Sequence, residues 1–327
     1  MELIMVDFGK VLGGKANKIM VPAFDTPGDN TPAFRQAFLW PAWSKDLLLW
    51  WRSSGTPLFI TGPAGCGKTQ SVKQLASLLN YPVFEVTGHN RLETPELVGH
   101  YVLQGQQTVW QDGPLTRAMK EGGIFLLNEV DLLDPSTAAG LNTVLDGAPL
   151  LIPDTGAVIQ PHKGFRFIAT ANTAGGGDMS GLYQGTLRLN AAFMDRFVVL
   201  EADYLSLEQE QELVQSLYPS LHSFMTQTIC RVAEKVRALY TRKDDGLDKE
   251  LDDFRDRVSV PLSTRSVLRW AEWATLCAPM VRKGTNALEY SMMRAFGFRC
   301  PPVMQVALKE LLQRMLPDIN STDNKED

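Results

Sequence analysis

A glycine-rich segment follows the pattern G-x-x-x-x-G-K-[ST] and consists of Gly62, Pro63, Ala64, Gly65, Cys66, Gly67, Lys68 and Thr69. Glycines let the backbone curl until its N–H groups point inward at phosphate oxygens, and a following helix adds unpaired amides and its dipole. In this pattern Lys68 reaches the β- and γ-phosphates, and the Thr69 hydroxyl lies on Mg²⁺. The segment therefore predicts a site for a nucleoside triphosphate with Mg²⁺.

The residues around this segment favour a phosphate-binding loop over the alternative, a glycine turn without a ligand. Residues 57–61 form a short apolar run that is typical of a buried strand. From Thr69 to Leu79 the apolar residues recur at helical spacing. A strand, a loop and a helix in this order are expected at the start of an α/β domain.

Five short apolar runs predict the strands of a parallel sheet that is buried on both faces: Leu58–Thr61, Val83–Val86, Ile124–Leu127, Phe165–Thr170 and Phe197–Leu200. Because helical stretches alternate with these runs, we expect an α/β/α three-layer core with a five-stranded parallel sheet. After residue 201 the strand signal ends. Helical patterns then cover a helix opened by Ser206 and the ranges 221–243, 264–278, 285–297 and 302–315.

The chain accordingly divides into four expected parts. Residues 1–43 are predicted to be an irregular N-terminal extension, and residues 44–202 the α/β nucleotide-binding core. Residues 203–317 are expected to form a helical lid domain, with a charged surface connection at 242–257. The polar residues 318–327 are predicted to be a disordered tail.

Composition narrows the classes of function. The chain has 32 Lys and Arg against 37 Asp and Glu, a net charge of −5, which argues against a general attraction to nucleic acid. Its four cysteines form no C-x-x-C pair, so neither zinc nor a disulfide framework is expected, and reduced thiols fit a cytoplasmic location. The apolar runs are too short for a bilayer, and the N-terminus does not resemble a signal peptide, so no membrane is expected.

Two polar residues, Asn128 and Glu129, follow the predicted strand 124–127. In P-loop enzymes a strand beside the P-loop strand ends in a metal-side acid and a general base, so we expect this strand next to residues 58–61. Glu129 is then the predicted base, and Asn128 offers Mg²⁺ an amide oxygen without negative charge. This predicts weaker support for Mg²⁺ with hydrolysis retained. The alternative is that Glu129 is only a surface residue at a strand end.

A second predicted strand, 165–170, is followed by Asn172, whose amide can hydrogen-bond the attacking water or the γ-phosphate. Arg196 stands at a predicted helix end and could face the γ-phosphate of a neighbouring subunit; a salt bridge with Asp195 is the alternative. Arg265 is expected in the first turn of a helix capped by Ser263. A cation is unfavourable at that end of a helix, which indicates a phosphate partner.

Taken together, these motifs resemble the AAA+ ATPases of the MoxR-like branch. In that family the P-loop is Walker A, Asn128 and Glu129 are Walker B, Asn172 is sensor 1, Arg196 is the arginine finger and Arg265 is sensor 2. The stretch from 169 to 197 is similar to the CobS-type ATPase subunits of aerobic cobaltochelatase, and residues 97–115 to the CbbQ/NorQ type. The resemblance covers roughly residues 55–280. The family more often has Asp than Asn at position 128, which puts the hydrolysis rate in doubt more than ATP binding.

The resemblance implies ATP and Mg²⁺ as cofactors and a homo-hexameric ring with ATP bound between subunits. It also implies insert hairpins that touch a substrate, for which residues 98–111 and 148–163 are the candidates because they contain turn-prone peptides; ordinary loops are the alternative there. The expected activity is ATP-dependent remodelling of a protein partner, often one with a von Willebrand A domain or a metalloenzyme.

Two other functions stay open from the sequence. One is an AAA+ motor linked to nucleic acid, although the acidic balance and the lack of a recognisable nucleic-acid-binding motif argue against it. The other is a scaffold that binds ATP but hydrolyses it weakly, as Asn128 would permit.

Overall fold

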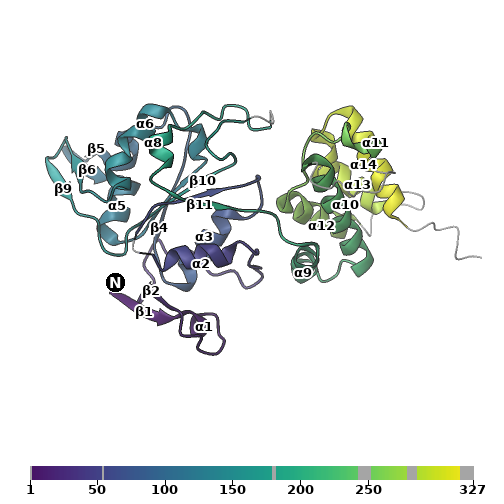
Figure 1. The fold of residues 1–327 in the computed structure, drawn as a ribbon, viewed down its shortest axis with the longest axis horizontal. Coiled ribbons are helices and arrows are strands. Elements are labelled where there is room, and N and C mark those ends of the chain that lie inside the picture. Colours follow the sequence, from purple (N-terminus) through teal and green to yellow (C-terminus); the bar gives the residue numbers. More distant parts are fainter. Residues whose placement is uncertain (1, 54, 179–181, 242–251, 278–285, 317–327) are drawn as a thin grey trace, which may run out of the picture. The chain divides into compact units, whose positions relative to one another are not determined.

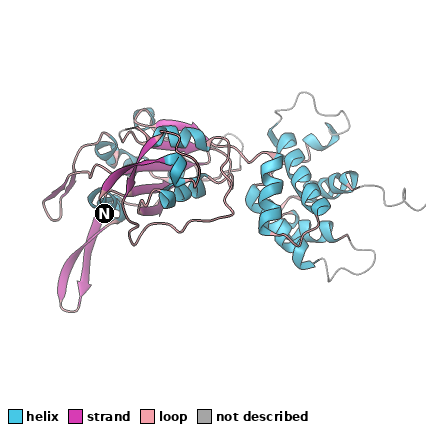
Figure 2. Cartoon of the chain, turned by 90° about the horizontal axis from the view of Figure 1, so that it is seen from below, coloured by secondary structure: helices cyan, strands magenta, loops and turns pink. Residues whose placement is uncertain are grey.

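The computed structural model describes residues 2–53, 55–178, 182–241, 252–277 and 286–316. The chain divides into two compact units, Met1–Asp203 and Tyr204–Asp327 (Figure 1). The first unit combines strands and helices, whereas the described residues of the second contain helices and no strand (Figure 2). Residue 278 of one predicted helix, and the predicted disordered tail 318–327, lie outside the described residues.

A five-stranded sheet forms the centre of the first unit. Its strands are β3 (Leu58–Thr61), β4 (Val83–Thr87), β7 (Ile124–Asn128), β10 (Arg166–Ala171) and β11 (Val198–Glu201). The order is β11-β3-β10-β7-β4, and every neighbouring pair is parallel. The predicted five-stranded parallel sheet is therefore confirmed, with each strand within one residue of its expected bounds.

The strand that ends in Asn128 does not lie beside the P-loop strand, contrary to our expectation. Strand β10 lies between the two: Ala169 pairs with Phe59 of β3 on one side and with Leu127 of β7 on the other. All residues of β3, β7 and β10 are buried, so their apolar patterns carry no information about which strand is central. The consequence is that Asn172, just after β10, lies between the ends of the P-loop strand and of β7.

Helices cover both faces of this sheet. Successive side chains of a strand point to opposite faces, and Phe59, Phe125, Leu127 and Phe167 all belong to one apolar cluster. That cluster includes residues of α5 (Pro114–Glu121), α6 (Pro135–Gly140), α7 (Asn142–Leu145) and α8 (Ala191–Met194). Figure 1 shows α2 (Ser44–Trp51) and α3 (Lys68–Leu78) on the other side of the sheet. The predicted three-layer α/β/α arrangement is confirmed.

We expected the N-terminal segment to be irregular, but part of it forms a small sheet. Strand β1 (Leu3–Asp7) pairs antiparallel with β2 (Met20–Phe24), with α1 (Phe8–Val11) between them. Pro22 cannot donate a ladder hydrogen bond, so a proline inside an apolar run argues against a strand. Here Pro22 pairs with Met5 in a two-stranded sheet.

Two further hairpins project from the core. Strand β5 (Gly99–Gln104) pairs with β6 (Gln107–Asp112) after the short helix α4 (Thr94–Val98), and β8 (Leu150–Ile152) pairs with β9 (Ala157–Ile159). These hairpins occupy the two segments that the family resemblance marks as inserts. The Tyr101 hydroxyl donates to the Asp154 carbonyl oxygen at 3.1 Å, so the two hairpins are linked.

The second unit packs its helices around one apolar cluster that includes Trp270, Phe254 and Phe296. Its elements are α9 (Leu207–Leu217), α10 (Ser223–Thr241), α11 (Asp252–Arg255), α12 (Thr264–Cys277), α13 (Ala287–Ala295), the 3₁₀ turn η4 (Gly297–Arg299) and α14 (Pro302–Met315). The capping box predicted at Ser206 is present, with Gln209 as its second member. The segment 242–257 is not only a surface connection, because α11 buries Phe254; residues 242–251 lie outside the described residues.

A buried ion pair joins three helical segments of this unit. Glu210 of α9 is 1% exposed. Its carboxylate accepts hydrogen bonds from both terminal nitrogens of Arg237, at 2.7 and 3.1 Å. The Arg237 Nε donates to the Leu262 carbonyl oxygen at 2.7 Å, and the Thr264 hydroxyl donates to Glu210 at 2.8 Å. Both charges are therefore paired with each other and hydrogen-bonded to neighbouring groups, as buried charges need to be. No helix in the described part of the chain is both long and apolar enough to span a membrane.

Candidate nucleotide-binding site

The P-loop connects β3 to α3 with the backbone that its glycines predict. Gly62, Gly65 and Gly67 have φ values of 147°, 76° and 98°, which favour glycine. A Cβ atom on Gly62 would also lie 2.2 Å from the Ala202 carbonyl oxygen. Gly67 is the N-cap of α3, and Lys68 is its first residue. The helix N-terminus therefore opens directly into the loop, as an anion site requires.

The Lys68 ammonium group is bound on three sides. It donates to the carbonyl oxygens of Gly62 at 2.7 Å and Pro63 at 3.1 Å, and to Asn172 Oδ1 at 3.1 Å. Lys68 and Asn172 are 104 residues apart in sequence. The structure thus brings the P-loop lysine and the predicted sensor residue into one cluster. Within the P-loop, burial raises the pKa of the Cys66 thiol, which therefore stays protonated near neutral pH.

Thr69 and Asn128 meet at the start of α3 and the end of β7. The Thr69 hydroxyl donates to Asn128 Oδ1 at 2.7 Å, and the Thr170 hydroxyl donates to the same oxygen at 2.9 Å. Asn128 Nδ2 donates to Glu85 Oε1 at 2.7 Å. Because the Thr69 proton points at Asn128, the lone pairs of its oxygen are available to a ligand. Neutral oxygens with a carboxylate close by fit a hard cation such as Mg²⁺.

Glu129 lies at the turn that follows β7. Its φ and ψ are 54° and 43°, in the left-handed region that non-glycine residues rarely adopt. Gly88 packs against this turn: its N–H donates to the Asn128 carbonyl oxygen at 2.7 Å, and a Cβ there would lie 2.6 Å from the Glu129 carbonyl oxygen. Strained backbone of this kind persists where the surroundings hold it, and it clusters at functional sites.

A cavity of about 400 Å³ lies at this end of the sheet, and its lining includes Glu129, Asp131, Asn172, Tyr183 and Gln184. Of these lining residues, Glu129 is exposed and Asn172 accepts a hydrogen bond from Lys68, so the cavity adjoins the Lys68 cluster. The arrangement can therefore hold a small polar group between a carboxylate and an amide, next to the phosphate-binding loop.

Asp131 is a site residue that the sequence argument missed. It is fully buried, and its Oδ2 accepts from the backbone N–H groups of Asn172 at 3.1 Å and Thr173 at 3.0 Å, and from the Thr173 hydroxyl at 3.0 Å. Asp131 therefore fixes the backbone that carries Asn172. The signal that could have found it is its position two residues after Glu129, in the 3₁₀ turn Val130–Leu132 that follows β7.

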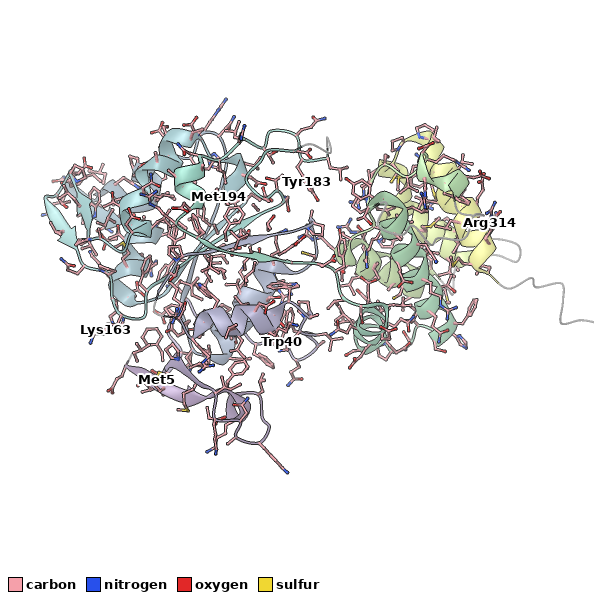
Figure 3. All side chains as sticks on the ribbon, in the orientation of Figure 1. Met5, Trp40, Lys163, Tyr183, Met194 and Arg314 are labelled. Atoms are coloured by element: carbon pink, nitrogen blue, oxygen red, sulfur yellow. The ribbon has the colours of Figure 1, made fainter. Side chains whose placement is uncertain are left out.

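Tyr183 is a second residue that the sequence argument did not place in the site (Figure 3). The backbone N–H of Ala64 donates to the Tyr183 hydroxyl at 3.1 Å, and the Tyr183 N–H donates to Asp178 Oδ2 at 2.6 Å. A P-loop amide thus has a side-chain oxygen as its partner, where the motif would direct it to phosphate. Residues 181–186 contributed only to the family resemblance in the sequence.

The two predicted arginines belong to different units, Arg196 to the first and Arg265 to the second. Arg196 is paired with Asp146, at 2.8 Å from Nε and 3.0 Å from Nη2, and it donates from Nη1 to the Ala192 carbonyl oxygen at 2.5 Å. The alternative to the arginine finger was a salt bridge with Asp195, but Arg196 pairs with Asp146, which is 50 residues away in sequence. This hydrogen bond raises the pKa of Arg196. Arg265 is exposed in the first turn of α12, in the second unit. Ser263 Oγ accepts from the Ser266 N–H at 3.3 Å, as a cap would.

Comparison with known proteins gives a family match over residues 57–197, described as an AAA domain of the dynein-related subfamily. Protein NorQ of Paracoccus denitrificans is 36% identical over 185 residues, which are 56% of this chain and 65% of NorQ. The chain therefore spans slightly less than two thirds of that relative. The uncharacterized protein SERP0979 of Staphylococcus epidermidis is 33% identical over 209 residues, or 57% of this chain and 76% of that protein.

The aerobic cobaltochelatase subunit CobS of Sinorhizobium sp. is 29% identical over 264 residues, which are 78% of this chain and 76% of CobS. Among solved structures, the chain is similar to the RuvB Holliday junction branch migration motor of Thermotoga maritima, with a TM-score of 0.44 and 15% identity. That similarity covers 77% of this chain and 65% of RuvB.

The family match contains four of the five strands of the sheet, β3, β4, β7 and β10, and ends just before β11. It includes the P-loop, Asn128, Glu129, Asn172 and Arg196. The relatives include both types that the sequence motifs indicate. The chain therefore belongs to the AAA+ ATPases of the dynein-related, MoxR-like branch, the branch of NorQ and CobS.

Proposed function

We propose that this protein binds ATP with Mg²⁺, hydrolyses it at interfaces between copies of itself, and uses the cycle to remodel a protein partner. The observation that carries the proposal is the clustering of the P-loop, Asn128 and Asn172 at one end of the sheet, through the bonds from Lys68 and Thr69. A P-loop, a metal-side oxygen and a sensor amide are the parts that phosphoryl transfer to water requires.

Each residue has a proposed role in this reaction. Residues 62–69 hold the phosphates, with Lys68 at the β- and γ-phosphates. Thr69 and Asn128 hold Mg²⁺, which when bound neutralises charge on the phosphates. Glu129 takes the proton of the attacking water, and Asn172 orients that water or the γ-phosphate.

We further propose that the working form is a ring, with a hexamer as the expected size. Arg196 would serve the site of the neighbouring subunit as an arginine finger, after exchanging Asp146 for phosphate, and Arg265 would serve as a sensor from the lid. The bidentate pairing of Arg196 with Asp146 supports this role, because a carboxylate and a phosphate match the guanidinium fork in the same way.

The two linked hairpins support a protein client. Leu103 on the first hairpin is 75% exposed, and Leu151 and Val158 on the second are also exposed. Exposed apolar side chains at such positions are available for contact with another protein. We propose a client of the kind the family suggests, a von Willebrand A-domain protein or a metalloenzyme, in the cytoplasm.

Replacing the P-loop lysine tests the nucleotide site. Lys68→Ala removes the ammonium group that would bind the phosphates, so affinity for MgATP is expected to fall about 10- to 100-fold. Equilibrium binding of a fluorescent ATP analogue measures this, with Lys163→Ala as the control for loss of an exposed lysine. Equal affinities in the two variants would contradict the proposal. Strong stimulation of ATP hydrolysis by DNA would favour a nucleic-acid motor instead.

Removing the Tyr183 hydroxyl is expected to strengthen ATP binding. That hydroxyl accepts the Ala64 N–H, which a phosphate oxygen would otherwise accept, so Tyr183→Phe removes a competitor of the ligand. Affinity for MgATP should rise about two- to tenfold, the worth of one hydrogen bond. Tyr101→Phe, which removes a hydroxyl between the hairpins, is the matched control. A weaker affinity in Tyr183→Phe would mean that the hydroxyl assists the ligand instead.

A further inference from the structure

We propose that Glu85 is a positioning residue of the magnesium site, and that it supplies the negative charge that Asn128 lacks. The inference deepens the proposed function and rests on it. Glu85 lies on the edge strand β4, and its Oε1 accepts from Asn128 Nδ2 at 2.7 Å. Nothing in the sequence around Glu85 marks it as part of the site, since 43 residues separate it from Asn128.

Glu85 determines the orientation of the Asn128 amide. An asparagine amide presents an oxygen at one end and an NH₂ group at the other, and a half turn of the amide exchanges them. The hydroxyls of Thr69 and Thr170 contact Asn128 Oδ1, but a hydroxyl can donate or accept, so these contacts fit either end. An ionised carboxylate only accepts. Glu85 therefore selects the orientation in which the oxygen faces Thr69.

Glu85 is itself held in place by a residue of α3. Its other oxygen, Oε2, forms an ion pair with Lys73 Nζ. Lys73 lies on α3 four residues after Thr69, so both side chains lie on the same face of that helix. The side chains of Lys73 and Glu85 are partly buried. Thr69, Asn128, Glu85 and Lys73 form a closed chain of contacts that begins and ends on α3.

The charge of Glu85 also acts on the oxygen of Asn128. Hydrogen bonds to an ionised acceptor are shorter and stronger than neutral ones, and bonds in a chain polarise one another. The bond from Asn128 Nδ2 to Glu85 draws the amide toward the form with more negative charge on Oδ1. Asn128 and Glu85 together then do what one carboxylate does where the family has Asp.

This pairing makes a specific prediction about exchanging the two groups. Asn128→Asp alone places a carboxylate against Glu85 at hydrogen-bond distance, and two such charges repel. It should therefore weaken the effect of Mg²⁺ on nucleotide binding rather than improve it. Glu85→Gln alone removes the charge and no longer selects one orientation of Asn128. In the double variant Asn128→Asp/Glu85→Gln, the new amide can donate to the new carboxylate, so the pair is restored with its charge on the metal side.

The test is binding of a fluorescent, non-hydrolysable ATP analogue as a function of Mg²⁺ concentration and in EDTA. The ratio of affinities with and without Mg²⁺ is expected to fall about tenfold in Glu85→Gln and in Asn128→Asp, and to return to the wild-type range in the double variant. Glu85→Ala should fall like Glu85→Gln. The affinity of each variant in EDTA is its own reference, so an effect of the altered charge on the phosphates themselves does not enter the ratio. Glu121→Gln, which breaks another partly exposed ion pair of the first unit, is the control and should match the wild type.

Three results would overturn the inference: an unchanged ratio in Glu85→Gln and Glu85→Ala, a gain in Asn128→Asp alone, or a double variant no better than the single ones. These differ from failure of the proposed function, in which the wild type itself would bind the analogue neither in EDTA nor with Mg²⁺ and both proposals would fall.

Discussion

The Glu129→Gln variant is expected to hydrolyse ATP about 10²–10⁴ times more slowly than the wild type, the usual contribution of a general base. The amide keeps the size and the hydrogen-bonding capacity of the side chain but takes no proton from water. Because Glu129 belongs neither to the P-loop nor to the Lys68 cluster, nucleotide affinity should change by no more than about twofold.

Steady-state release of phosphate and equilibrium binding of the ATP analogue give the two quantities separately. Glu121→Gln, an exposed carboxylate on α5, should match the wild type in both. If the wild type turns over no faster than Glu129→Gln, the protein is a nucleotide-binding scaffold with weak hydrolysis, and the motor function proposed here is wrong. If it turns over faster, the trapped variant offers a direct way to capture the client in the presence of ATP.

The Arg237→Met variant should lower the free energy of unfolding of the second unit by about 3–5 kcal/mol, the cost of leaving a buried charge without its partner. Glu210 is 1% exposed and would keep only the Thr264 hydroxyl as a hydrogen-bond partner among those described above. The Leu262 carbonyl oxygen would lose its donor as well. The methionine retains most of the volume of the arginine side chain. The loss in the free energy of unfolding therefore reports the missing charge rather than missing packing.

Hydrogen exchange of the α10 and α12 amides measures this loss in the second unit by itself. Arg257→Met is the matched control, because Arg257 pairs with Glu310 in a more exposed setting and should cost less than about 1 kcal/mol. The double variant Arg237→Met/Glu210→Met should recover at least about half of the loss, since it removes both charges. Equal losses in Arg237→Met and Arg257→Met would show that the buried pair contributes no more than a surface one.

The parts of the fold that depend on local sequence could be predicted. The five strands are short apolar runs because a parallel sheet is buried on both faces, and each was found within one residue. The P-loop is a local device, so its glycines fix its backbone wherever it occurs. The helix caps at Ser206 and Ser263 depend on residues three positions apart, and they too were visible in the sequence.

The parts that depend on contacts distant in sequence could not be predicted. The order of the strands is one, because β7 and β10 have the same buried pattern. The partners of Asn128 are another. From the sequence alone, the missing charge at this position predicts weaker support for Mg²⁺, whereas the structure shows the carboxylate of Glu85 beside it. The contact of Tyr183 with Ala64 spans 119 residues, and no local rule connects the two.

The central position of β10 has a mechanical consequence. A strand with a neighbour on each side must break two hydrogen-bonded ladders to shift, so β10, like β3 and β7, is held more firmly than the edge strands β11 and β4. Asn172, the proposed sensor, lies one residue past the end of β10 and is therefore held at a firm base. A change in what Asn172 binds would then move the chain that follows it, toward α8 and Arg196, more easily than the strand that precedes it. The strand order thus makes the sheet the rigid part and the connection from Asn172 to Arg196 the movable part. In the proposed ring, each subunit would then report its own nucleotide at the surface that it offers to the next subunit.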